Sequence, residues 1–226
     1  FHPFSFHTDW NLLKKILYIG IPNGLENSMF QLGKILVLSL VTSFGTASIA
    51  ANAVSNNIAM YAVLPGMSIG FAMLTVSAQC VGAGDFEQVK YYTKKLMKLT
   101  YICLILMNIL VVLLLPFIIK VYGLSAEASE YARRILIYHS CCVVTIWPLS
   151  FSLANTLRAA ADVKYTMILA IVSMWTFRIG FSYILGSYLK WGVFGIWVAM
   201  TIDWLFRSIC FTIRYLGGKW KHASLV

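Results

Sequence analysis

Long apolar segments separated by short polar ones run through the whole sequence. Six of them are long enough to cross about 30 Å of hydrocarbon, which takes about 20 helical residues. They cover approximately residues 10–44, 46–81, 98–120, 133–157, 165–188 and 193–216. Backbone groups in lipid must be paired within their own segment, so each segment is predicted to be a helix. The predicted fold class is all-α, a polytopic membrane protein with six transmembrane helices.

Prolines interrupt four of the six predicted helices. A proline removes one internal hydrogen bond and clashes with the preceding turn, so these helices are predicted to bend. The residues are Pro22, Pro65, Pro116 and Pro148.

The composition excludes a soluble protein. Hydrophobic residues make up 60% of the 226 residues and charged residues only 12%, whereas a soluble chain has about 25% charged residues. The net charge of +10 fits lipid headgroups and cytoplasmic loops better than nucleic acid in so apolar a chain. No HExxH, GxSxG or Walker motif occurs, and the five cysteines lack metal-site spacing. We therefore expect no enzyme activity, cofactor, metal site or nucleic-acid partner.

Lysine and arginine in the short loops set the predicted orientation. With both ends in the cytoplasm, 11 basic residues lie inside and 4 outside, which satisfies the positive-inside rule. The predicted location is a plasma membrane, such as a bacterial inner membrane. The inside set is Lys14, Lys15, Lys90, Lys94, Lys95, Lys98, Arg158, Lys164, Arg214, Lys219 and Lys221, and the outside set is Lys120, Arg133, Arg134 and Lys190.

The first segment carries a carboxylate beside a polar face. Asn23, Asn27, Gln31 and Lys34 fall within an arc of roughly 80° on a helix, and Glu26 lies to one side of it. A charge inside a bilayer needs a partner, a wet cavity or a function. We predict that Glu26 and Asn27 exchange a coupling cation, Na⁺ or H⁺, while Asn23 and Gln31 line a substrate cavity. The alternative is that this face only holds helices together.

Amides in the second segment are further candidates for the cavity. Asn52 and Asn56 stand one helical turn apart, so they could line the same cavity or serve as hydrogen-bonding contacts between helices. His139 is alone in its segment, near the outer end, and we expect it to be a satisfied polar group.

Three more charges lie within the last two segments. Asp203 and Arg207 have the i, i+4 spacing of an ion pair within one helix. Arg178 lies at comparable depth, where a long guanidinium could also reach Asp203. We predict that these charges clasp the fifth and sixth segments together, with a role in gating as the alternative.

Several motifs together resemble the multidrug and toxic compound extrusion (MATE) family of transporters. Their order matches the second half of that family, over nearly the whole sequence. They are Gly20-Ile21-Pro22-Asn23-Gly24-Leu25-Glu26-Asn27, Ala78-Gln79-Cys80-Val81-Gly82-Ala83-Gly84-Asp85, Leu157-Arg158-Ala159-Ala160-Ala161-Asp162-Val163-Lys164, Trp175 to Arg178, Asp203-Trp204 through Arg214, and Gly218-Lys219-Trp220.

The resemblance implies twelve helices in two six-helix lobes, with this chain, residues 1–226, as the C-terminal lobe and an N-terminal lobe as its partner. It implies an antiporter that exports drugs or other organic, often cationic, compounds in exchange for Na⁺ or H⁺, and it matches Glu26 to a coupling acid. The family's usual Arg-Gly-Ala-Gly-Asp turn has alanines at 159 and 161 here, which predicts a more helical turn. Two rivals stay open: a flippase for lipid-linked saccharides, and a six-span scaffold or channel subunit without transport activity.

Overall fold

The computed structural model describes residues 10–222, and within this range it contains helices and no strand. Eleven helical elements follow one another. They are α1 (Trp10–Thr42), α2 (Thr46–Gly82), α3 (Phe86–Val121), α4 (Ala126–Thr145), the π-helical η1 (Pro148–Ser152), α5 (Leu153–Ala159), α6 (Val163–Ser173), the π-helical η2 (Met174–Gly180) and η3 (Ser182–Tyr188), α7 (Gly192–Leu216), and the short 3₁₀ helix η4 (Lys219–His222).

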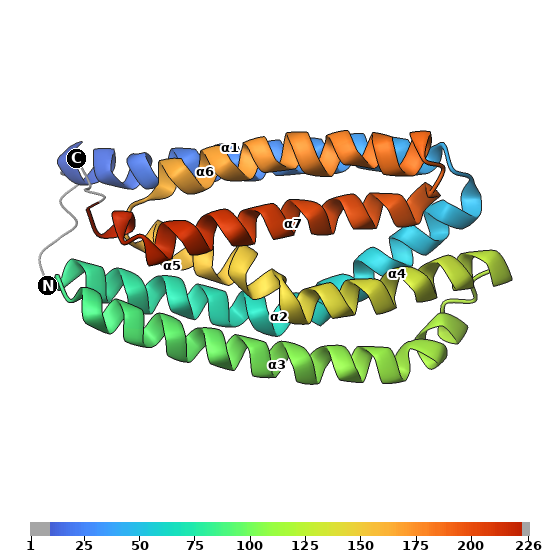
Figure 1. Cartoon of the computed structure of the whole chain (residues 1–226), viewed down its shortest axis with the longest axis horizontal. Helices are drawn as coiled ribbons and strands as arrows, with labels where there is room; N and C mark the ends of the chain where they lie inside the picture. Colours follow the sequence, from blue (N-terminus) through green and yellow to red (C-terminus); the bar gives the residue numbers. More distant parts are fainter. Residues whose placement is uncertain (1–9, 223–226) are drawn as a thin grey trace, which may run out of the picture.

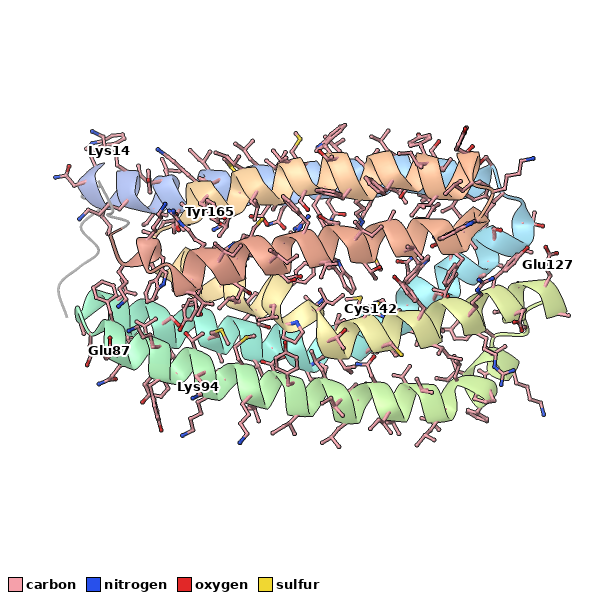
Figure 2. All side chains as sticks on the ribbon, in the orientation of Figure 1. Lys14, Glu87, Lys94, Glu127, Cys142 and Tyr165 are labelled. Carbon is pink, nitrogen blue, oxygen red and sulfur yellow. The ribbon has the colours of Figure 1, made fainter. Side chains whose placement is uncertain are left out.

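The helices form one elongated bundle. α1 packs along α6 on one side, α2 packs along α3 on the other, and α7 lies between them with the bent α4–η1–α5 segment (Figure 1). The described chain starts and ends at the same end of this bundle (Figure 1). Lys14 and Glu87 lie at that end and Glu127 at the opposite one (Figure 2). Because α1 and α2 pack mainly on different partners, the space between them is left for a cavity.

Four helices of the described chain are long and apolar enough to span a membrane: α2, α3, the continuous Val163–Tyr188 helix and α7. The pair Ala126–Thr145 and Pro148–Ala159 qualifies as a fifth if it is taken as one broken span. α1 is the most polar of the predicted spans and does not qualify by composition, although it runs beside α6 (Figure 1). The first predicted span is therefore a full-length helix with a polar side.

The third helix begins 12 residues before the predicted span. Asp85 caps it, since its side chain accepts a hydrogen bond from the Gln88 backbone N–H at 3.0 Å, and such a cap satisfies one of the free donors at a helix start. Hydropathy marks only the stretch within hydrocarbon, so the basic first turns of α3 were not part of that prediction.

Only one of the four prolines breaks a helix sharply. Pro148 follows the end of α4, and the chain turns by 56° there. Pro22, Pro65 and Pro116 lie inside α1, α2 and α3, which stay continuous. The Ser150 hydroxyl donates to the Trp204 backbone carbonyl of α7, so the bent segment is tied to the centre of the bundle.

Small residues let helices approach closely, for example at Gly195 and Gly33. A Cβ added to Gly195 of α7 would lie 2.8 Å from the Leu185 carbonyl carbon of η3, and one added to Gly33 of α1 would lie 2.2 Å from the Met174 Cε. Membrane helices without a hydrophobic driving force between them rely on such close packing.

The turn between α5 and α6 differs from the prediction of a more helical connection. α5 ends at Ala159, and Ala161 has a φ of 63°, in the left-handed region. The Asp162 N–H bonds to the Leu157 carbonyl at 3.0 Å and the Ala161 N–H to the Arg158 carbonyl at 3.0 Å, the arrangement that ends a helix through a left-handed residue. Alanine therefore occupies a conformation that glycine adopts more easily.

Candidate functional site

A cavity of about 740 Å³ lies between α1 and α2. α1 and α2 form its two sides, and α4, η1, α5, η2 and α7 contribute the rest of its wall. Its surface is mainly aromatic and aliphatic, with amides and positive charges at separate points. This is the size and lining of a typical pocket for a small organic molecule. The aromatic members are Phe30, Phe71, Trp147, Phe151, Trp197 and Trp204.

The amides predicted on α2 do line the cavity. Asn52 is buried, and its side-chain carbonyl accepts a hydrogen bond from the Trp197 indole N–H of α7 at 3.1 Å. Asn56 lies one turn further on, with its amide donating to the Asn52 backbone carbonyl at 2.8 Å. Asn57, the next residue along α2, lines the cavity too. Asn52 thus holds α2 against α7 while Asn56 and Asn57 stay available to a ligand.

The polar face predicted on α1 lines this cavity only at Lys34. Phe30 and Lys34 line it, whereas Asn23, Asn27 and Gln31 do not. Seven residues make almost two helical turns, so Asn23 and Asn27 lie on the same side of α1 as Phe30 and Lys34, about 10 Å nearer the start of the helix. Asn23 is half-buried, and Asn27 and Gln31 are exposed on the lobe. Their assignment to the substrate cavity and to cation coupling stays a prediction.

Glu26 forms an ion pair that the sequence reasoning missed. The Arg158 guanidinium donates to its Oε1 at 2.6 Å, across 132 residues of sequence. Both side chains are largely buried, at 14% and 20% exposed. Arg158 also donates to the Asn155 side-chain carbonyl at 3.1 Å and lines the cavity. Glu26 Oε2 is buried and has no hydrogen-bond partner within the described part of the chain.

The i, i+4 pair on α7 forms as its spacing indicates. Arg207 Nε donates to Asp203 Oδ1 at 2.9 Å, and both side chains are almost fully buried. Arg207 also donates to the Ala170 carbonyl of α6 at 3.1 Å, and the Ser173 hydroxyl donates to the Asp203 carboxylate. The clasp between α6 and α7 is therefore made by Arg207 and Ser173, not by Arg178. Whether these charges also take part in gating stays a prediction.

Three cations surround one aromatic ring on α1. The Arg178 guanidinium carbon lies 4.8 Å from the centre of the Phe30 ring, the Lys34 Nζ 5.1 Å and the Arg207 guanidinium carbon 5.9 Å. An aromatic face attracts a cation at such distances. Within residues 10–222 no carboxylate lies within ion-pair distance of Arg178 or Lys34, although Asp203 acts on Arg178 from further away.

His139 lies deeper in the lobe than its sequence position indicated. It is buried and lines the cavity, with its ring edge-on to Trp197 and Trp204 at centroid distances of 5.3 and 5.6 Å. Its Nδ1 has no hydrogen-bond partner among the described residues, so the expectation of a satisfied polar group is wrong for this atom. Sequence alone gave no signal for this, because the two tryptophans come from another helix.

Long apolar helices around an organic-sized cavity, with charges held inside the bundle, are typical of one lobe of a membrane transporter. The MatE family model matches residues 22–184. The chain therefore belongs to the MATE family of transporters and supplies one lobe of such a protein. Members of this family are transporters and not enzymes, and the chain is an integral membrane protein.

The relatives agree with this assignment. The chain is 28% identical over 222 residues to the "Probable multidrug resistance protein YoeA" of Bacillus subtilis, covering 96% of the chain and 46% of the relative. It is 22% identical over 221 residues to the "Probable multidrug resistance protein NorM" of Thermotoga maritima, covering 96% and 47%. An outward-facing multidrug resistance MATE transporter of the MOP superfamily superposes with a TM-score of 0.84 at 18% identity, covering 96% of this chain and 50% of its own. The chain thus spans about half the length of these proteins.

Proposed function

We propose that this chain is the C-terminal lobe of a two-lobe, twelve-helix secondary transporter that expels organic compounds in exchange for Na⁺ or H⁺. Its family membership, its span of about half of each relative and its central cavity support this proposal. The N-terminal lobe of the same polypeptide would complete the cavity, and the lipid bilayer would surround both lobes. A plasma-membrane location, with both ends of the lobe in the cytoplasm, follows from the distribution of basic residues.

The observation that carries the coupling proposal is the ion pair between Glu26 and Arg158. It joins α1 to α5 from opposite parts of the sequence. A proton or a Na⁺ ion on the Glu26 carboxylate would neutralise the charge that holds Arg158. The unpartnered Oε2 gives such a cation an oxygen that Arg158 does not occupy. Cation binding and the α1–α5 ion pair would then exclude one another.

Such mutual exclusion is what a coupled exchanger needs. A ligand shifts an equilibrium between two conformations only by its difference in affinity for them. In this proposal the cation prefers the conformation with the Glu26–Arg158 pair open, and the cation-free protein prefers the one with the pair closed. The lobes would change access as the pair opens and closes.

Glu26→Gln in the full-length transporter tests this role. The variant keeps the size of the side chain but lacks the charge that attracts a cation. In proteoliposomes loaded with fluorescent organic compounds of either charge, we expect export driven by a Na⁺ or pH gradient to fall at least tenfold. Glu127→Gln removes an exposed acid at the far end of the bundle and serves as the matched control. Gradient-driven export that is unchanged in Glu26→Gln would refute the coupling role.

A further inference from the structure

The charges that line the cavity are all positive. Lys34, Arg158 and Arg178 contribute side chains to its wall, and no aspartate or glutamate of residues 10–222 does. Including the residues directly behind the wall, four cations accompany two carboxylates: Lys34, Arg158, Arg178 and Arg207 against Glu26 and Asp203.

The two carboxylates are already occupied by their own partners. Glu26 pairs with Arg158 at 2.6 Å and Asp203 with Arg207 at 2.9 Å. This leaves Lys34 and Arg178 as the excess charges, on the two sides of one wall formed by α1 and η2. Unpaired charges at bilayer depth are costly and need a partner or a wet site. Their aromatic neighbour, Phe30, compensates only a small part of that cost.

We propose that Lys34 and Arg178 bind the anionic group of a soluble aromatic organic anion, such as a carboxylate or a sulfonate. This proposal deepens the proposed function. It rests on that function only because it treats the bound compound as the transported substrate. The guanidinium of Arg178 presents a planar set of donors that fits a carboxylate, and the Lys34 ammonium adds a second charge. The cationic preference implied by the family resemblance has no carboxylate in this wall to support it.

The remainder of the cavity fits the body of such a compound. Trp147 and Phe151 stack with centroids 5.1 Å apart, and Trp204 meets Phe151 edge-on at 5.7 Å. These faces accept a planar ring system, and Asn56 and Asn57 offer hydrogen bonds at one side. A volume of about 740 Å³ suits a compact aromatic molecule. A lipid-linked saccharide would need more amide and hydroxyl groups for its sugars than this aromatic wall supplies.

The anion site is distinct from the cation-coupling pair. Glu26 and Lys34 are 8 residues apart on α1, a rise of about 12 Å along a helix. In this proposal the charged group of the substrate binds at Lys34 and Arg178, and the coupling cation binds at Glu26.

Equilibrium binding of two related dyes tests the proposal. Carboxyfluorescein and rhodamine 6G share a xanthene ring system, but the first is anionic and the second is cationic. Fluorescence polarisation with the purified full-length transporter in an uncharged detergent measures both without any ion gradient. We expect carboxyfluorescein to bind at least tenfold more tightly than rhodamine 6G. We expect Lys34→Gln and Arg178→Gln each to weaken its binding by about tenfold, the usual effect of losing a charged hydrogen bond.

Two further variants complete the series. Lys34→Arg keeps the charge and should retain the affinity for carboxyfluorescein, while Lys120→Gln removes an exposed charge outside the cavity and should change nothing. If Arg178→Gln does not fold, Lys34→Gln decides alone. Equal or tighter binding of rhodamine 6G, or unchanged carboxyfluorescein binding in Lys34→Gln, would overturn the proposal.

The source of the anion is tested in nanodiscs. Carboxyfluorescein that stays bound when phosphatidate is added to neutral lipid supports a soluble ligand, whereas its displacement would assign the site to a lipid phosphate and overturn the proposal. Because binding needs no gradient, an unchanged export rate in Glu26→Gln would refute the coupling role and leave this result standing. If carboxyfluorescein were not preferred over rhodamine 6G while gradient-driven export still depended on Glu26, the anion proposal would be overturned and the coupling role would stand.

Discussion

Asp203→Asn tests whether the buried ion pair on α7 holds the lobe together. The asparagine keeps the shape of the side chain and can still accept from Ser173 and Arg207. It removes the only carboxylate within ion-pair distance of Arg207 among the described residues. The guanidinium would keep its bond to the Ala170 carbonyl at 3.1 Å, and it would remain a buried charge near Arg178 and Lys34, which surround the same ring.

The magnitude follows from the burial of both partners. Asp203 is 0% exposed and Arg207 is 4% exposed, so water cannot replace the lost partner. Removing one member of such a pair costs about 3–5 kcal/mol, while replacing both by apolar residues of similar volume is often neutral. We therefore expect Asp203→Asn and Arg207→Met each to destabilise the protein by about 3–5 kcal/mol. The double variant Asp203→Leu with Arg207→Met should be much closer to the wild type.

A double-mutant cycle of Asp203→Leu, Arg207→Met and the combination of the two measures this difference. Unfolding of the purified transporter in mixed micelles, followed by tryptophan fluorescence against increasing sodium dodecyl sulfate, gives the free energy for each variant. Glu87→Gln is the control, because it breaks an exposed i, i+3 pair with Lys90 of similar length, 2.7 Å, and should leave the midpoint unchanged. Single variants as stable as this control, combined with lost transport, would refute the structural role and favour gating.

Two further predictions concern the backbone. Gly195→Ala should destabilise the lobe by about 1–3 kcal/mol, because its Cβ would lie 2.8 Å from the Leu185 carbonyl carbon and a backbone atom cannot rotate away. In a thermal-shift assay, Gly20→Ala is its control, since no atom within 4 Å meets that Cβ; equal melting temperatures for the two variants would contradict the close packing. Ala161→Gly should raise the stability by about 1 kcal/mol, since it relieves a left-handed alanine. A lower melting temperature in this variant would show that the turn depends on the alanine side chain.

The sequence by itself determined that the chain lies in a lipid bilayer and where most of its helices run. Hydropathy depends only on which residues are neighbours along the chain, so it predicted a helical membrane protein and helix limits close to those of α1, α2 and α7. Helical spacing likewise predicted the Asp203–Arg207 pair, because both partners lie on one helix. The family motifs added the two-lobe architecture, and the family match confirmed the membership.

Only the tertiary structure decided which distant charges meet. Arg158 was counted among the cytoplasmic loop charges, yet it pairs with Glu26 from 132 residues away. Arg178 lies over Phe30 of α1, and Asp203 is near enough to act on its charge but not to form an ion pair with it. Such contacts depend on the rotation of each helix about its axis, where one residue changes the direction of a side chain by about 100°. That rotation is set by packing against the neighbouring helices, which local sequence does not specify.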